Sequence, residues 1–185
     1  MDSGDEANIP CAQSARNGLV QVYTGDGKGK TTAALGLALR ASGQGLRVCV
    51  FQFMKGSKRC GEHQFAERYG AFDVVQPGQG SYFSQSAPQR LAAARQALTL
   101  AKSLISSGRY DLLVLDEILA ACHGGLLSSQ DILDIIAARP PGTELILTGR
   151  GATPEVIAAA DLVTEMVPVK HPYAKGIRAR KGIEY

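Results

Sequence analysis

The 185-residue sequence contains no tryptophan, and its four cysteines (Cys11, Cys49, Cys60 and Cys122) form neither a C-x-x-C pair nor a metal-ligand spacing. This pattern is typical of reduced thiols, so we expect a cytoplasmic protein. No apolar run is long enough to cross a bilayer, and the N-terminus lacks the apolar centre of a signal peptide, so we expect no membrane association. The net charge of +3 is too small to indicate a nucleic-acid partner.

Two signals that would define other protein classes are also missing. There is no Asn-Lys-x-Asp motif, through which a GTPase would read guanine, so the sequence argues against that class. The three histidines, His63, His123 and His171, are scattered along the chain. The sequence therefore predicts no metal cluster built on histidine.

The chain is expected to fold as a single domain. Hydrophobic residues make up 45% of it and charged residues 20%, which is the balance of an ordinary globular protein able to bury a full core. Residues 1–17 are polar and show no periodic apolar face. We expect them to form a flexible tail, the alternative being a segment that orders over a ligand. The folded domain is predicted to span residues 18–185.

The strongest signal is a glycine-rich stretch typical of a phosphate-binding loop. An apolar run of strand composition precedes it and a helix-forming run follows it, which is the context that a P-loop requires. Backbone amides of such a loop, together with the helix N-terminus, bind phosphate groups. The predicted nucleotide-binding residues here are Thr24, Gly25, Asp26, Gly27, Lys28, Gly29, Lys30, Thr31 and Thr32.

Within this loop, Lys30 is expected to reach the terminal phosphates and the Thr31 hydroxyl to bind Mg²⁺ (or Mn²⁺). Two details depart from the usual G-x-x-x-x-G-K-T pattern. Thr24 stands where the first glycine belongs and Gly25 follows one residue later, which predicts a different loop path. Lys28 adds a second cation two residues before Lys30. Two ammonium groups this close repel each other, and a bound polyphosphate would turn that repulsion into attraction.

Strands and helices are predicted to alternate along the chain. We expect strands at residues 19–23, 47–53, 72–75, 112–117, 144–148 and 162–167, and helices at 33–40, 62–69, 88–107, 129–138 and 154–160, with Ser129 and Thr153 as N-caps of the last two. Near-continuously apolar strands in this order predict an α/β fold, with a mostly parallel sheet covered by helices on both faces. The expected architecture is that of the P-loop nucleotide hydrolases, RecA-like in kind.

A second chemical signal lies at the end of the strand predicted at residues 112–117. Asp116 has the form of a Walker B aspartate and is expected to hold the metal ion, directly or through water, beside Thr31. Apolar strands that end in aspartate are common, but one that follows a P-loop at this separation is a specific signal. Glu117 can be interpreted as a general base or as a ligand of a sugar hydroxyl, and the residues alone leave both open.

Together these motifs resemble the ATP:cob(I)alamin adenosyltransferases, also called corrinoid adenosyltransferases, over residues 18–185. The resemblance rests on the stretch from Val22 to Ala34 and on Gln52-Phe53-Met54-Lys55-Gly56. It continues with Leu115-Asp116-Glu117, Thr148-Gly149-Arg150-Gly151, Pro168-Val169-Lys170-His171 and Lys181-Gly182-Ile183-Glu184-Tyr185. The last two motifs are not general features of P-loop proteins, so the combination is specific.

The resemblance implies transfer of the 5′-deoxyadenosyl group of ATP to the cobalt of a reduced corrinoid, with release of triphosphate. Cobalt(I) is then the nucleophile, so no protein base is required, and the resemblance places Glu117 on the ribose hydroxyls. Lys28 and Lys30 would act catalytically by stabilising charge on the leaving triphosphate, and Arg150 looks like a further phosphate ligand. The family is thought to bind ATP in the reverse direction to other P-loop proteins, which fits the displaced Gly25.

The resemblance also implies a corrinoid-binding loop and partners. The family often carries Gly-Phe-Thr-Trp in one loop, where aromatic rings press on the lower face of the corrin; this chain has Gly80-Ser81-Tyr82-Phe83 instead. Tyr82 and Phe83 are therefore expected to take the catalytic place of those rings. A homodimer and a flavin- or flavodoxin-type reductant are also implied. Lys170 and His171 lie in a matching motif without an assigned role.

Two other functions stay open from the residues alone. An ordinary P-loop ATPase or kinase would use the same loop and release ADP. A non-catalytic nucleotide-binding module would instead use its basic C-terminal tail to hold nucleic acid or an acidic partner. That tail carries Lys170, Lys175, Arg178, Arg180 and Lys181 against Glu184. A solvated or dimer-facing strand is the expected role of such a charge run.

Overall fold

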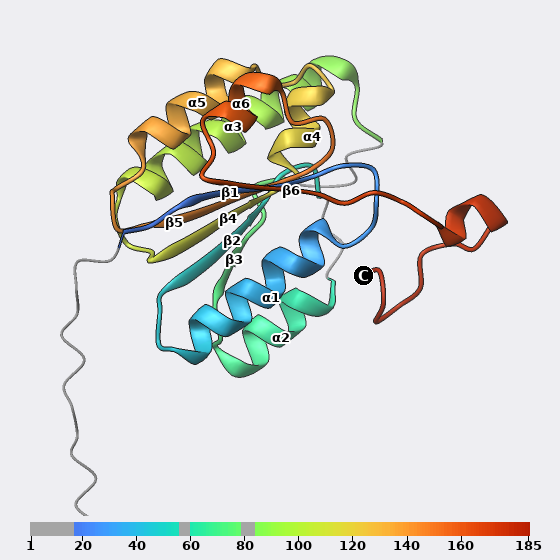
Figure 1. The fold of residues 1–185 in the computed structure, drawn as a ribbon, viewed down its shortest axis with the longest axis horizontal. Coiled ribbons are helices and arrows are strands. Elements are labelled where there is room, and N and C mark those ends of the chain that lie inside the picture. The colour runs from blue at the N-terminus through green and yellow to red at the C-terminus, as the bar shows by residue number, and fades with distance from the viewer. Residues whose placement is uncertain (1–16, 56–59, 79–83) are drawn as a thin grey trace, which may run out of the picture.

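A computed structural model describes residues 17–55, 60–78 and 84–185. Six strands form one sheet in the order β3-β2-β4-β5-β1-β6, and every described pair is parallel (Figure 1). The strands are β1 (Val20–Thr24), β2 (Val48–Gln52), β3 (Asp73–Val75), β4 (Leu112–Asp116), β5 (Glu144–Thr148) and β6 (Leu162–Glu165). The predicted α/β class with a parallel sheet is thus confirmed. The tail predicted at residues 1–17 falls, apart from Asn17, outside the described residues.

Helices cover both faces of this sheet, as predicted. The helices α1 (Lys30–Gly43) and α2 (Gly61–Tyr69) lie on one face. The other face carries α3 (Ala87–Ser106), α4 (Ile118–His123), α5 (Ser129–Ala138) and α6 (Pro154–Ala158) (Figure 1). The 3₁₀ turn η2 (Pro172–Lys175) lies in the C-terminal segment. Among the helices of the described ranges, none combines the length and apolarity needed to cross a membrane.

Two apolar cores flank the sheet. On the α1 side the helix contributes Ala34, Ala38 and Ala41, which recur at helical spacing and let its backbone approach the strands closely. The larger core lies under α3 to α6 and includes long aliphatic side chains such as Ile132 and Ile135. The central strands β2 and β4 are buried along their whole length, which explains their continuous apolar sequence.

Three local features differ from the sequence-based expectation. The short helix α4 was not predicted. The N-cap of α5 is Ser128 rather than Ser129, because the Ser128 hydroxyl accepts a hydrogen bond from the Asp131 amide at 3.2 Å. The strand β6 lies at the sheet edge and all four of its residues are exposed, so the expected burial on both faces does not extend to it.

The sheet brings the chemically interesting loops to one edge. The P-loop follows β1, Lys55 follows β2, Glu117 follows β4 and Arg150 follows β5. In a parallel sheet the carboxyl ends of all strands lie at the same edge, which is where open α/β proteins bind ligands. After β6 the chain runs outward and then returns, so that its C-terminal end lies beside the start of α1 (Figure 1).

Candidate functional site

The path of the P-loop is set by its contact with the chain just after β6. The Gly27 amide donates to the Met166 carbonyl at 2.6 Å, and the Met166 amide donates to the Thr24 carbonyl at 2.9 Å. A Cβ atom on Gly25 would lie 2.5 Å from the Met166 carbonyl oxygen, and Gly25 has a φ of +92°. Only glycine fits such a position, so the loop depends on its glycines for this packing.

Thr24, which stands in place of the usual first glycine, belongs to the sheet. It is the last residue of β1, and its buried hydroxyl accepts a hydrogen bond from the Ala152 amide at 3.2 Å. Thr24 therefore ties the P-loop to the loop after β5.

Lys30 is buried beneath the loop that it follows. Its side chain donates to the carbonyls of Gly25 at 2.7 Å and Gly27 at 2.6 Å, and only 8% of the residue is exposed. Burial lowers the pKa of Lys30; Glu117 opposes this shift and Arg150 adds to it. To contact a phosphate, the ammonium has to exchange these carbonyls for phosphate oxygens.

Asp116 is the centre of a buried polar network. Its Oδ1 accepts hydrogen bonds from the hydroxyls of Thr31 and Thr148, each at 2.8 Å, and the residue is fully buried. The Thr148 hydroxyl in turn accepts from the Glu117 amide at 3.0 Å. The predicted meeting of Thr31 and Asp116 is thus present. Their oxygens are the hard ligands that Mg²⁺ prefers, so these two residues fit such an ion.

Lys55 occupies the other side of Asp116 and was not predicted as a site residue. Its ammonium lies 3.0 Å from Asp116 Oδ2 and 3.2 Å from Glu62 Oε1, and Gln52 donates to the same Glu62 oxygen at 3.0 Å. Burial alone would lower the pKa of Lys55, but Asp116 and then Glu62 outweigh it and the net shift is upward. The signal available in sequence was the basic loop that follows β2.

Glu117 is held in an uncommon backbone conformation. It has a φ of +64°, and Met54, which follows the neighbouring strand, has a φ of +56°. Residues other than glycine seldom adopt this region, and such conformations cluster at active sites. Burial raises the pKa of Glu117 and the Asp116 charge raises it further, while the nearby cations, Lys30 first among them, lower it.

These groups surround a cavity of about 950 Å³ at the carboxyl edge of the sheet. Of the predicted site residues, it is lined by Asp26, Gly27, Lys28, Gly29, Lys30, Thr31, Thr32, Glu117 and Arg150. Lys55, Glu62, apolar residues of α1 and α2 and several residues of the C-terminal segment also line it. Thr24, Gly25 and Asp116 are not part of the lining. Tyr82 and Phe83 fall outside the described residues, so their predicted role stays a prediction.

The C-terminal segment contributes to this wall through an ion pair. Glu184 lies 2.8 Å from the Lys28 ammonium and 3.1 Å from the Arg180 guanidinium. These partners, Arg180 first, lower the pKa of Glu184 to about 2. Across the loop, Arg150 lies 3.6 Å from Asp26. Lys28 and Arg150, which the sequence predicts to bind phosphate, thus both have carboxylate partners in this structure.

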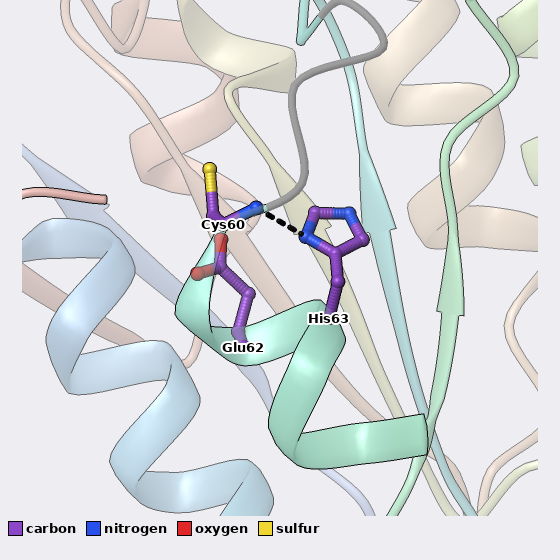
Figure 2. Close-up of side chains that lie close together, drawn as sticks. All are labelled: Cys60, Glu62 and His63. Carbon is purple, nitrogen blue, oxygen red and sulfur yellow. Dashed lines mark hydrogen bonds between the residues drawn. The ribbon is translucent and has the colours of Figure 1, made fainter. Parts of the chain in front are cut away.

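One of the three scattered histidines lies beside other side chains of metal-binding type. His63 lies with Cys60 and Glu62 at the start of α2 (Figure 2). His171 lines the large cavity.

Comparison with known proteins agrees with this geometry. The family model described as ATP:corrinoid adenosyltransferase BtuR/CobO/CobP matches residues 16–185. A corrinoid adenosyltransferase of Pseudomonas aeruginosa is 40% identical over 172 residues, which cover 91% of this chain and 84% of that protein. Its counterpart in Escherichia coli K12 is 36% identical over 181 residues, covering 97% of this chain and 91% of that protein.

A solved structure supports the fold independently. A KaiC-like protein from the archaeon Pyrococcus horikoshii superposes with a TM-score of 0.55 at 15% identity, covering 81% of this chain and 73% of that chain. At this level of identity the likeness concerns the fold alone. The sequence matches, which extend over nearly the whole chain, carry the assignment further: this protein belongs to the ATP:corrinoid adenosyltransferase family.

Proposed function

We propose that this protein transfers the 5′-deoxyadenosyl group of ATP to the cobalt(I) of a corrinoid and releases triphosphate. The observation that carries the proposal is the convergence of three cations, Lys28, Lys30 and Arg150, on one cavity in a chain of this family. Such a site suits a reaction in which the entire triphosphate is the leaving group, because charge then develops over all three phosphates.

The chemistry requires little of the protein beyond positioning and charge. The electron pair of the reduced cobalt forms the new bond to the ribose C5′, and the C5′–O5′ bond breaks with its electrons passing to the triphosphate. No proton is transferred in this step, so no general base is needed. Lys28 leaves Glu184, and Lys30 leaves the carbonyls of Gly25 and Gly27, to bind the phosphate oxygens as their charge grows.

A divalent cation, Mg²⁺ or Mn²⁺, is proposed to be held by Thr31 and Asp116. The support is that a hydroxyl and a carboxylate oxygen lie 2.8 Å apart beside the P-loop, with Thr148 fixing the orientation of the carboxylate. When bound, the ion would supply neutralising charge to the triphosphate. The Lys55 ammonium already lies beside the second oxygen of Asp116 and contributes a positive charge there.

Glu117 is proposed to accept hydrogen bonds from the ribose hydroxyls. Its support is position: Glu117 lines the cavity and its backbone is fixed by the Thr148 hydroxyl. A carboxylate with a rigid backbone orients a sugar well, and orientation is a large part of catalysis when no base is involved.

A homodimer is proposed because the β6 edge of the sheet is exposed in the described part of the chain. The strand β6 is wholly exposed, and the segment after it exposes Val167, Val169 and Tyr173. An uncovered edge strand with apolar side chains favours association. The need for cobalt(I) further implies a strong one-electron reductant, flavin- or flavodoxin-type, and a cytoplasmic setting.

The phosphate product tests the proposal. The protein is incubated with ATP and chemically reduced cobalamin, and the products are separated by ion-exchange chromatography. Triphosphate formed in step with adenosylcobalamin is the expected result. ADP formed without alkylation of cobalt would instead establish an ordinary ATPase or kinase, and no turnover would leave a binding module.

A further inference from the structure

Three side chains with different metal-binding atoms meet at the N-terminus of α2. The Cys60 sulfur, a carboxylate oxygen of Glu62 and a ring nitrogen of His63 all lie within 4.8 Å of one another (Figure 2). Cys60 is buried, with 8% of its surface exposed, and Glu62 and His63 are half-buried. No part of the nucleotide chemistry proposed above uses the thiol or the imidazole.

The local backbone explains why these side chains converge. Cys60 is the N-cap of α2 and has an extended conformation, while Glu62 and His63 belong to the first helical turn. The Cys60 amide donates to His63 Nδ1 at 3.2 Å, and the Cys60 side chain accepts from the backbone of residue 63, which completes a capping box. This arrangement holds the sulfur and the imidazole on the same side of the helix start.

Capping alone does not require these residue types. Serine at the N-cap and glutamine three residues later form the usual capping box. Cysteine and histidine satisfy the same backbone groups while adding a sulfur and an imidazole, and neither type is preferred for capping. The Glu62 carboxylate lies beside this thiol and this imidazole. The three together form a set of soft and hard ligands that a helix cap does not need.

The Glu62 carboxylate has acceptor capacity beyond the two side chains that contact it. Lys55 and Gln52 both contact its Oε1, and a carboxylate offers about four lone-pair directions over its two oxygens, so it can bind a further partner. Burial would raise the pKa of Glu62, but hydrogen bonds from Gln52 and others, together with the charge of Lys55, lower it overall.

We propose that Cys60, Glu62 and His63 form a Zn²⁺ site. Thiolate, imidazole and carboxylate are the three ligand types of zinc in proteins, and three protein ligands leave a fourth position for water or another ligand. Zinc–ligand bonds of about 2.0–2.3 Å would bring the ligand atoms to roughly 3.5 Å apart. The side chains have to close by about 1 Å, which rotation about their own bonds can supply. When the ion binds His63 Nδ1, that nitrogen gives up the hydrogen bond from the Cys60 amide, because its one lone pair then holds the metal.

The site shares Glu62 with the nucleotide-binding network. Glu62 and Gly61 line the large cavity, and Lys55 links Glu62 to Asp116. An ion bound to Glu62 competes with Lys55 for that carboxylate. Occupation of the zinc site therefore changes the charge balance around Asp116 without contacting the P-loop.

The test uses substitutions that retain the helix cap and remove the ligands. Cys60→Ser and His63→Gln replace the sulfur and the imidazole by the residues that a capping box favours, so the metal-free protein should keep its thermal midpoint. Cys122→Ser is the matched control, since it removes a thiol elsewhere on the chain. All proteins are freed of metal with EDTA and studied without nucleotide or corrinoid.

Binding is measured with Co²⁺ as a spectroscopic probe and with Zn²⁺ in competition against a chromophoric chelator. The wild type and Cys122→Ser should bind about one equivalent and show the near-ultraviolet thiolate-to-cobalt absorption. Cys60→Ser should lose that absorption, and either ligand substitution should weaken Zn²⁺ binding by at least about tenfold. Zinc should also raise the thermal midpoint of the wild type but not of the double variant.

The proposal is overturned if the Cys60→Ser protein keeps the thiolate absorption, or if the double variant binds Zn²⁺ as tightly as the wild type. Should Cys60→Ser fail to fold, Zn²⁺ binding by His63→Gln decides the proposal, because that variant retains the helix cap. Activity towards ATP and corrinoid plays no part in these measurements, so they are independent of the function proposed above.

Discussion

The ammonium of Lys28 lies 2.8 Å from the carboxylate of Glu184, 156 residues further along the chain. A cation of the P-loop is thus paired with the C-terminal segment, and in the function proposed above a phosphate replaces that partner. Since Arg180 also contacts Glu184, the carboxylate keeps a partner when Lys28 leaves. The proposed exchange therefore changes the partner of Lys28 and leaves the contact between Arg180 and Glu184 in place.

This exchange predicts the effect of removing the competing carboxylate. Glu184→Gln should tighten ATP binding by about two- to fivefold, because an exposed ion pair that opposes binding is then absent. Isothermal titration with ATP measures the change, and raising the salt concentration should shrink the difference between variant and wild type. Weaker ATP binding in the variant would show that Glu184 supports the site rather than competing for it.

The two P-loop lysines should differ in their kinetic signatures. Lys30→Ala should abolish turnover, since it removes a charge-assisted contact to the leaving group, an effect of roughly 3 kcal/mol or more by analogy with oxyanion donors. Lys28→Ala should lower kcat more than it weakens ATP binding, because it acts on charge that develops during the reaction. Normal turnover in the Lys28 variant would contradict this role.

Asp116 and Glu117 are adjacent but should fail in different ways. Asp116→Asn should raise the Mg²⁺ concentration needed for activity, because an anionic oxygen beside the ion is lost. Glu117→Gln should instead weaken ATP through the ribose. Comparing ATP with 2′-deoxy-ATP separates the two, and a Glu117 variant that still discriminates between them as the wild type does would rule out the ribose contact.

Lys55 should act as the charge partner of Asp116 when no divalent ion is present. Lys55→Met leaves the buried Asp116 and the nearby Glu62 without their shared cation, so the thermal midpoint should fall. Mg²⁺ should then stabilise the variant more than it stabilises the wild type, as calorimetry without nucleotide would reveal. Lys102→Met, which breaks an exposed pair with Asp134, is the control and should change little. Equal responses to Mg²⁺ in wild type and Lys55→Met would contradict the assignment.

Tyr82 and Phe83 are expected to contact the corrin. Their double substitution by alanine should spare ATP binding and the thermal midpoint, yet strongly reduce activity with cobalt(II) substrate and a reductant. Activity with pre-reduced cobalt(I) should fall less, because the difficult reduction is bypassed. A parallel loss of both activities and of the thermal midpoint would mean that the rings anchor the loop, since burying one ring contributes about 2–3 kcal/mol.

Signals that are local in sequence predicted most of the fold. The β5 strand, Glu144–Thr148, begins and ends as expected, because an apolar run is bounded by Pro-Pro-Gly and glycine. The P-loop and the meeting of Thr31 with Asp116 also followed from local motifs. The short α4 helix did not, since its six residues carry too little periodicity to be distinguished from a buried strand end.

Contacts that depend on the order of strands in the sheet could not be predicted from the sequence. Lys55 reaches Asp116 only because β2 pairs with β4, with Gln52 opposite Asp116. Glu184 reaches Lys28 only because the chain returns after β6. No periodicity records either contact. Likewise, His63 appeared isolated among scattered histidines, although its neighbour Cys60 lies only three residues before it and the helix start turns both side chains together.

The position of β1 in the sheet has a consequence for the order of folding. This first strand pairs with β5 and β6, the last two strands along the chain, and the P-loop glycines pack against Met166. A nascent chain that ends before these strands has no partner to hold its P-loop in shape. Pairings between such distant segments form late and slow the folding of a domain. The loop is therefore expected to reach the shape seen here only after synthesis has passed Met166.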